Sequence, residues 1–269
     1  MIKLKRISLL VVLNRWLIQF GIDIRRTYFA FRALPSLFKE YFILKKYSDA
    51  DWPVELSYPC LNDRFDFAGT IDKQYFHQDI YVANQIFSRD PFSHIDIGSR
   101  IDGFIAHLAV FRKIKIIDIR PVDLGLTNVE FIQADICSEN FKMNNAVSVS
   151  CLHTIEHFGL GRYGDPIGFK LWEIGISNIW NIVDDSGILY LSFPVGKQRI
   201  VFNAHRIFKP STVLNNLKNS KILSFVYIDD EGKFNETLLT NCSDIDNVVA
   251  NFDYGLGIFV LQKSIVDSI

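Results

Sequence analysis

The sequence has little cysteine and no paired cysteine motif. Four cysteines occur in 269 residues, and none of them forms a C-x-x-C pair. Zinc ribbons and disulfide frameworks need paired cysteines at defined spacings, so the pattern argues against both classes. Scattered single cysteines are typical of a reducing compartment, and we therefore expect a cytoplasmic protein. The cysteines are Cys60, Cys137, Cys151 and Cys242.

A long apolar run is also missing. Residues 7–13 are apolar except for Ser8, and the polar residues Asn14, Arg15 and Gln19 follow. A membrane-spanning helix needs about 20 apolar residues, and a signal peptide needs a small-residue cleavage site after its apolar core. This segment therefore predicts neither a spanning helix nor a cleaved signal.

Net charge is close to zero, but the basic residues are unevenly distributed. Residues 1–47 contain ten Lys or Arg and two acidic residues, whereas the remainder contains 19 basic and 28 acidic residues. A basic segment on an acidic body is typical of contact with anionic membranes or nucleic acid. Apolar residues recur at near-helical spacing from Trp16 to Leu34. We expect a helical, amphipathic extension at residues 1–48, and its residues 1–47 either contact the inner face of a membrane or pack on the domain.

No internal repeat and no low-complexity segment occurs, and 49% of the residues are apolar, which is enough for a sizeable core. Trp52-Pro53 and Tyr58-Pro59 fall in a segment rich in turn formers. Residues 49–70 therefore predict a linker, and residues 71–269 a folded domain.

Within that domain, short β-branched apolar runs alternate with helical patterns, which predicts a doubly wound, mostly parallel α/β sheet. The expected strands are residues 94–98, 114–119, 129–136, 146–152 and 188–195, and the expected helices are 71–87, 104–111 and 168–183. Two further runs, 222–228 and 254–262, are separated by a polar stretch without a clear helix. They predict an antiparallel C-terminal strand pair at the edge of the sheet.

Acidic residues and a glycine fall where three of these strands end. Asp96 and Gly98 close the first strand, Asp118 ends the second strand 22 residues later, and Asp135 follows the third. Glycine lets a ligand approach a helix N-terminus, and an acid at the second position accepts hydrogen bonds from ribose hydroxyls. This pattern favours a nucleoside-binding crevice, although the acids could instead cap helices or close turns.

The block from Asp96 to Pro194 resembles the first five strands of class I S-adenosylmethionine-dependent methyltransferases. D-I-G resembles their first motif, Asp118 their ribose-binding acid, and Ala134-Asp135 their adenine-side motif. The segment S-C-L-H-T-I-E-H at residues 150–157 resembles their fourth strand and the turn that follows it. The resemblance implies S-adenosylmethionine as cofactor, and it places Glu156 in the cofactor pocket.

A narrower resemblance covers roughly residues 55–265. D-I-G-S-R-I-D-G, H-T-I-E-H-F-G-L-G-R-Y-G-D and F-N-A-H-R-I-F are similar to an uncharacterised-domain family of methyltransferase-like proteins. Bacterial members of that family are often associated with surface-polysaccharide synthesis. The resemblance implies a small-molecule or saccharide acceptor.

The glycine loop departs from the class I pattern D-x-G-x-G-x-G. Arg100 occupies the second glycine position and Asp102 the third. The Arg100 guanidinium could turn outward, bind the carboxylate of the cofactor, or block the site. We count Arg100 among the expected cofactor-binding residues.

The pentad H-T-I-E-H at residues 153–157 also matches the inverted zinc-protease motif H-x-x-E-H. That motif requires an established helix and a third protein ligand, whereas this pentad follows a strand directly. We therefore expect no metal site. We expect His153 to act as a general base, since histidine titrates near neutral pH, and His157 to help bind the acceptor.

Two later segments complete the predicted site. The glycine-rich loop at residues 158–165 contains Arg162 and is typical of a mobile cover over a crevice, or of a simple connecting turn. His205 and Arg206 follow the fifth strand, at the ligand-bearing edge of the sheet. We expect His205 to be a second candidate base, and Arg162 and Arg206 to bind the acceptor.

Other functions are less well supported. A non-catalytic Rossmann-fold binding protein with a degenerate cofactor site is the main alternative, because of Arg100 and Asp102. A nicotinamide enzyme would carry G-x-G-x-x-G, which is missing here. No N-P-P-[YF]-type segment follows the fourth strand to hold a flipped base, so no nucleic-acid substrate is expected.

Overall fold

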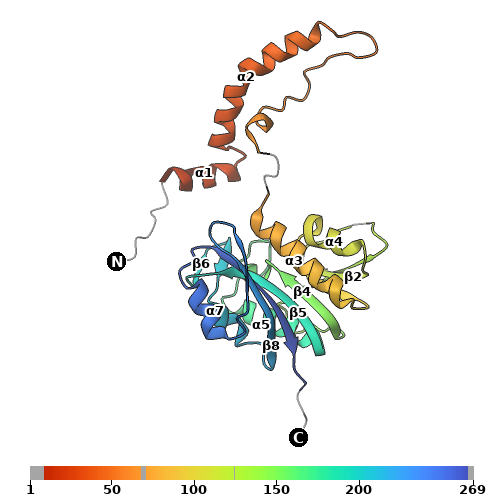
Figure 1. Ribbon diagram of the computed structural model, residues 1–269, viewed down its shortest axis with the longest axis vertical. Helices are drawn as coiled ribbons and strands as arrows, with labels where there is room; N and C mark the ends of the chain where they lie inside the picture. Colours follow the sequence, from red (N-terminus) through yellow and green to blue (C-terminus); the bar gives the residue numbers. More distant parts are fainter. Residues whose placement is uncertain (1–8, 68–70, 124, 266–269) are drawn as a thin grey trace. The chain divides into compact units, whose positions relative to one another are not determined.

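The computed structural model describes residues 9–67, 71–123 and 125–265. The chain divides into two compact units, Met1–Ile71 and Asp72–Ile269. Each unit has its own fold (Figure 1).

The first unit is helical, as expected for the N-terminal extension. It contains α1 (Leu9–Gln19), α2 (Ile24–Lys45) and a 3₁₀ turn, η1 (Asp63–Phe65). Asp23 caps α2, because its side chain accepts hydrogen bonds from the backbone N–H groups of Arg25 and Arg26. In the described part of the chain, no helix is both long enough and apolar enough to cross a membrane.

The second unit is built on a mixed eight-stranded sheet. The parallel strands are β1 (His94–Ile97), β2 (Ile114–Asp118), β3 (Val129–Gln133), β4 (Ala146–Leu152) and β5 (Val183–Val195). The strands β8 (Ser220–Ile228), β9 (Phe234–Thr237) and β10 (Gly255–Lys263) complete it, and the order is β3-β2-β1-β4-β5-β10-β8-β9. Strand β10 is antiparallel to both β5 and β8. The predicted fold class, a mostly parallel sheet with antiparallel C-terminal strands, is confirmed.

Helices cover both faces of this sheet. On one face lie α3 (Lys73–Arg89) and the segment formed by a π-turn, η2 (Ile101–Ile105), and α4 (Ala106–Ala109). Their side chains Val82, Ile86 and Phe104 pack in one buried cluster with strand residues such as Tyr190 and Ile258. The sequence predicted a helix at residues 104–111. The observed helical segment begins three residues earlier and ends two residues earlier.

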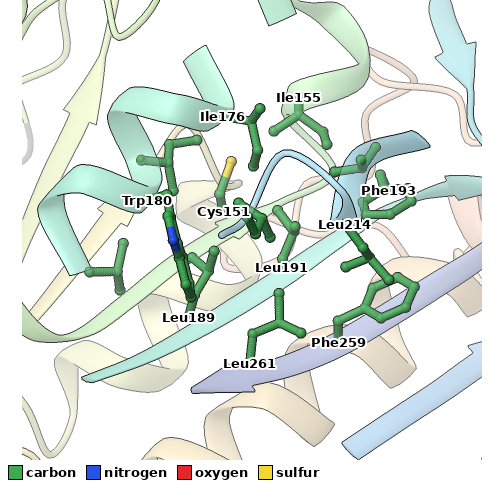
Figure 2. Close-up of a cluster of buried hydrophobic side chains, with 14 of the residues drawn as sticks. Cys151, Ile155, Ile176, Trp180, Leu189, Leu191, Phe193, Leu214, Phe259 and Leu261 are labelled. Carbon is green, nitrogen blue, oxygen red and sulfur yellow. The ribbon is translucent and has the colours of Figure 1, made fainter. Parts of the chain in front are cut away.

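On the other face lie α5 (Leu171–Ile182), α6 (Pro210–Leu214) and α7 (Cys242–Val249). Figure 2 shows Trp180 of α5 and Leu214 of α6 against Leu189, Leu191 and Phe259 of the sheet, all within the larger buried cluster. The second unit therefore has three layers.

The C-terminal region corrects two predictions. Strand β10 does not lie at the edge, because it inserts between β5 and β8, and the outermost strand there is β9. The polar stretch between the two predicted strands contains both β9 and α7. Helix α7 has only eight residues, and packing of Ile245 and Val249 on the sheet stabilises it.

Three smaller elements complete the second unit. A 3₁₀ turn, η3 (Ile155–His157), follows β4, and a hairpin of β6 (Arg199–Val201) and β7 (His205–Ile207) follows β5. Parallel pairing of β1 with β2 and with β4 brings the carboxyl ends of these strands to one edge of the sheet.

Candidate functional site

A pocket lies at the carboxyl ends of β1 to β4. It contains about 660 Å³ of empty space, part of which is open to solvent. Open α/β sheets bind ligands at this edge. Apolar side chains form much of its wall: Ile97, Ile117, Ile136, Phe158 and Leu171.

Gly98 lines this pocket directly after β1. Its φ of 67° lies in the left-handed region, which favours glycine. A Cβ at this position would lie 2.5 Å from Cγ2 of Thr154, in the loop after β4. The glycine is therefore needed for the close packing of two protein loops, besides any approach of a ligand.

Asp96 is completely buried and does not line the pocket. Its carboxylate accepts hydrogen bonds from the Ser99 N–H and hydroxyl groups, at 3.1 and 2.7 Å, and from the Ser150 hydroxyl. Burial raises its pKa to about 6, although these hydrogen bonds act in the opposite direction. Asp96 holds the turn after β1, and this placement gives no direct support to its predicted contact with a cofactor.

Asp118 lies in the pocket wall at the end of β2 and is paired with Arg120. The Arg120 guanidinium donates to both carboxylate oxygens of Asp118, at 3.0 and 2.7 Å, and the Arg120 N–H donates at 2.8 Å. The guanidinium also lies 4.3 Å from the ring centre of Tyr163. Sequence reasoning missed both Arg120 and Tyr163. The basic residue two positions after Asp118 was a usable signal, whereas the contact with Tyr163 has no local signature.

Asp135 follows β3 and also lines the pocket. One of its carboxylate oxygens accepts the N–H of Cys137 at 2.8 Å, which closes a turn. Asp118 and Asp135 therefore lie in the wall of one pocket, as the sequence predicted for its two nucleoside-binding acids. Their contact with a cofactor stays a prediction.

His153 is the pocket residue with the most unusual geometry. Its φ is 53°, and its N–H donates to the carbonyl and hydroxyl oxygens of Ser192. Its Nδ1 lies 2.7 Å from Oε1 of Glu156, which requires a proton on Nδ1 when the carboxylate is ionised. Its Nε2 is buried and has no hydrogen-bond partner among the residues that the structure describes. The ring of Tyr75, from α3, lies against the imidazole at 4.7 Å.

Glu156 lies behind His153 and is fully buried. Burial acts to raise its pKa, but attraction to His153, the hydrogen bond to His153 and attraction to His157 lower it below its usual value. The ionised carboxylate therefore fixes the tautomer of His153, and the lone pair of Nε2 is left for a reacting proton. Glu156 does not line the pocket, so it acts through His153.

The remaining predicted residues lie around the loop at 158–165. His157 lines the pocket, its Nδ1 donates to the carbonyl of Ala204 at 2.7 Å, and burial lowers its pKa. Arg162 donates to the same carbonyl at 2.9 Å. Arg206 is buried and donates to the carbonyls of Phe158 and Phe169, so these nitrogens anchor the loop rather than face the pocket.

Arg100 and His205 lie outside the pocket wall. The Arg100 guanidinium pairs with the neighbouring Asp102 and lies 4.7 Å from the ring centre of Tyr75, so it does not fill the pocket. His205 packs at 4.7 Å against Tyr254, and burial lowers its pKa to about 4. Of the predicted site residues, the pocket brings together Gly98, Asp118, Asp135, His153 and His157.

One family model matches part of this chain. Residues 113–224 match the family model described as "Caenorhabditis protein of unknown function, DUF268". This match covers less than half of the chain. No curated protein matches the sequence.

Many solved structures match this chain at low sequence identity. The N-methyltransferase NodS from Bradyrhizobium japonicum WM9, in complex with S-adenosyl-L-homocysteine, is 11% identical with a TM-score of 0.49, over 72% of this chain and 89% of its own. An S-adenosylmethionine-dependent methyltransferase from Clostridium acetobutylicum is 9% identical with a TM-score of 0.43, over 72% and 93%. The [4+2]-cyclase SpnF is 14% identical with a TM-score of 0.49, over 75% and 86%. Similarity at this level does not identify the reaction.

Proposed function

We propose that this chain is an S-adenosylmethionine-dependent methyltransferase that acts on a small-molecule or saccharide acceptor, in surface-polysaccharide synthesis. The observation that carries the proposal is His153, which lies in the wall of the pocket at the sheet edge. Its Nε2 is buried, and no residue within 9–67, 71–123 or 125–265 forms a hydrogen bond with it. An oriented imidazole without a protein partner at this position is suited to proton transfer.

The residues of the pocket fit the cofactor. Asp118 can accept hydrogen bonds from ribose hydroxyls, since its two oxygens offer more lone pairs than the donors of Arg120 occupy. Asp135 can accept from an adenine amino group, and Ile117 and Ile136 offer apolar surface to a purine. The bound cofactor would supply an activated methyl group on its sulfonium sulfur.

His153 would take the proton of an acceptor hydroxyl at Nε2 as the acceptor oxygen gains the methyl group. Glu156 would stabilise the resulting imidazolium through Nδ1, and Tyr75 would hold the ring in place. His205 is a second candidate base, and its lowered pKa keeps it neutral at pH 7. Residues of the loop at 158–165 line the pocket, and the loop would help to exclude water.

Cofactor binding is tested by isothermal titration with S-adenosylmethionine and S-adenosylhomocysteine. We expect micromolar binding that falls by roughly 100-fold in Asp118→Ala, since a lost charge-assisted hydrogen bond costs a few kcal/mol. Asp123→Ala removes an exposed acid that does not line the pocket, and it should bind like the wild type. A folded wild-type protein that binds neither compound would overturn the proposal.

Methyl transfer is tested with labelled cofactor and a panel of nucleotide sugars and free saccharides. His153→Gln should lower the rate by roughly 100-fold or more, which is the usual contribution of a general base. It should leave S-adenosylhomocysteine binding almost unchanged. His107→Gln, which replaces an exposed histidine, is the matched control.

A non-catalytic binding protein is the second candidate. The pairing of Arg120 with Asp118 favours it, because the carboxylate expected to bind ribose already has a partner. This candidate predicts that the folded protein binds neither compound, or binds without transfer to any acceptor.

A further inference from the structure

Helix α2 carries a continuous row of exposed apolar residues, which we call the aromatic stripe. Its members follow one another at intervals of four and three residues: Ile24, Tyr28, Phe31, Pro35, Phe38 and Phe42. This spacing places them on one face of the helix. All six are exposed, and the five other than Pro35 are between 45% and 68% accessible to solvent.

The preceding helix, α1, is equally uncovered. None of its eleven residues is buried, and Leu9, Leu10 and Trp16 are each at least two-thirds exposed. Asn14 of α1 accepts the N–H of Ile24 at 2.9 Å, so a hydrogen bond connects the two helices at their corner. Exposed apolar surface of this extent is typical of an interaction site rather than of a solvated helix.

Basic residues border the aromatic stripe. Four basic residues recur at intervals of seven: Arg25, Arg32, Lys39 and Lys46. The first three directly follow Ile24, Phe31 and Phe38 of the stripe, and Lys46 continues the same spacing. The two acids of this region already have partners. Asp23 caps α2, and Glu40 pairs with Arg64 at 2.8 Å. The face beside the stripe is therefore strongly positive.

We propose that α1 and the aromatic stripe bind the surface of an anionic lipid membrane, with the helices lying in the plane of the interface. Apolar and aromatic side chains would enter the boundary between headgroups and acyl chains, and the basic row would meet lipid phosphates. A second copy of the chain fits less well, because its stripe is bordered by no acidic row that could pair with the basic row. The acidic remainder of the chain would be repelled by the same membrane, which confines the contact to the first unit.

The test is co-sedimentation of the full-length chain with lipid vesicles. We expect binding to vesicles of phosphatidylcholine mixed with phosphatidylglycerol, much weaker binding to phosphatidylcholine alone, and weakening by salt. The double variant Phe31→Ser, Phe38→Ser should bind the mixed vesicles at least roughly tenfold more weakly, because it removes two inserted rings.

Matched controls separate the stripe from general hydrophobicity. Phe87 and Phe92 are exposed phenylalanines of the second unit, and replacing both by serine should leave vesicle binding unchanged. The variant Arg25→Gln, Arg32→Gln, Lys39→Gln should lose the preference for anionic lipid. Far-UV circular dichroism and thermal unfolding confirm that each variant is folded.

Several results would overturn the proposal. One is a folded wild-type chain that sediments with neither vesicle type, and another is equal binding by the stripe variant. A dimer in sedimentation velocity that the stripe variant dissociates, without vesicle binding, would assign the stripe to a second copy instead. Cofactor titration reads out the pocket separately, so this test does not depend on the proposed methyl transfer.

Discussion

At the residue scale, His153 shows how strongly one backbone conformation can shape a site. A φ of 53° is uncommon for a residue other than glycine and usually has a functional or structural cause. Here it follows β4 at once, and the two hydrogen bonds from its N–H to Ser192 help to hold it. The sequence predicted the residue and its neighbour Glu156, whereas the unpartnered Nε2 and the contact with Tyr75 depend on residues far away in the chain.

A network of buried, hydrogen-bonded polar side chains lies beneath the pocket between β1 and β4. His94 Nδ1 and Nε2 each lie 2.8 Å from a serine hydroxyl, of Ser148 and Ser150, and Ser150 in turn donates to Asp96. A neutral imidazole satisfies every hydrogen bond of this network, because its Nε2 donates to Ser150 and its Nδ1 accepts from Ser148. Burial lowers the pKa of His94 from 6.5 to about 3.

This shift predicts a pH-dependent contribution to stability. Between pH 6.5 and about 3, the unfolded chain binds a proton at His94 that the native protein does not, so the stability from His94 is lost as the pH falls. Asp96 acts in the opposite direction, since its native pKa of about 6 is raised above the usual 3.8. The difference in the free energy of unfolding between the wild type and His94→Gln therefore isolates His94.

In urea unfolding, the free energy of unfolding of the wild type minus that of His94→Gln should decrease by up to about 1.4 kcal/mol for each pH unit below pH 6.5. A difference that stays constant over this range would show that His94 titrates alike in the folded and unfolded states.

Gly98 gives a second prediction at this scale. Gly98→Ala should lower the free energy of unfolding by about 2 to 4 kcal/mol, because it combines an unfavourable positive φ with a clash against Thr154. Gly125→Ala is the matched control, since Gly125 has a φ of 57° with nothing within 4 Å of its added Cβ. It should cost only about 1 kcal/mol. Thr154→Ser removes Cγ2 and should restore part of the loss, and no restoration would contradict the assigned contact.

At the scale of elements, the strands that the sequence predicted well are the central ones. β1, β2 and β4 are buried β-branched runs, and the structure confirms them with ends within one residue of expectation. β9 and α7 were missed because they have only four and eight residues, which is too short for a clear periodic pattern. Such elements form because they pack on a sheet that already exists, which a local pattern does not report.

Whether the loop at 158–165 is mobile or ordered could not be predicted from the sequence. The glycine-rich segment at 158–165 was expected to be either a mobile cover or a simple turn. In the structure, the Asp165 carboxylate accepts the N–H groups of Gly159, Gly161 and Tyr163 at 3.0 to 3.2 Å, which fixes the loop against the pocket. The side chain of Asp165, six residues after Gly159, therefore organises this loop.

Asp165→Ala should release the loop. Without the carboxylate, the amides of Gly159, Gly161 and Tyr163 should exchange with deuterium roughly tenfold or more faster, while those of β4 should not change. Hydrogen exchange read by mass spectrometry checks this outcome. Unchanged exchange in the loop would mean that other contacts hold it.

At the scale of the whole molecule, the chain combines two different surfaces. The first unit presents exposed apolar helices with excess positive charge, and the second unit presents a pocket at the edge of an α/β sheet. The predicted boundaries at residues 48 and 70 stay predictions. Composition could reveal the charge asymmetry because it is a sum over residues. The pocket depends on strand order, and it was predicted from the residues at the strand ends together with the resemblance to methyltransferases.

The most direct test is a crystal structure of the full-length protein grown with saturating S-adenosylhomocysteine. We expect the ribose hydroxyls at Asp118, with Arg120 displaced or sharing the carboxylate, the adenine beside Asp135, and the sulfur on the side of His153. A ligand bound elsewhere, or a pocket without ligand density at saturating concentration, would contradict the assignment of this pocket to the cofactor.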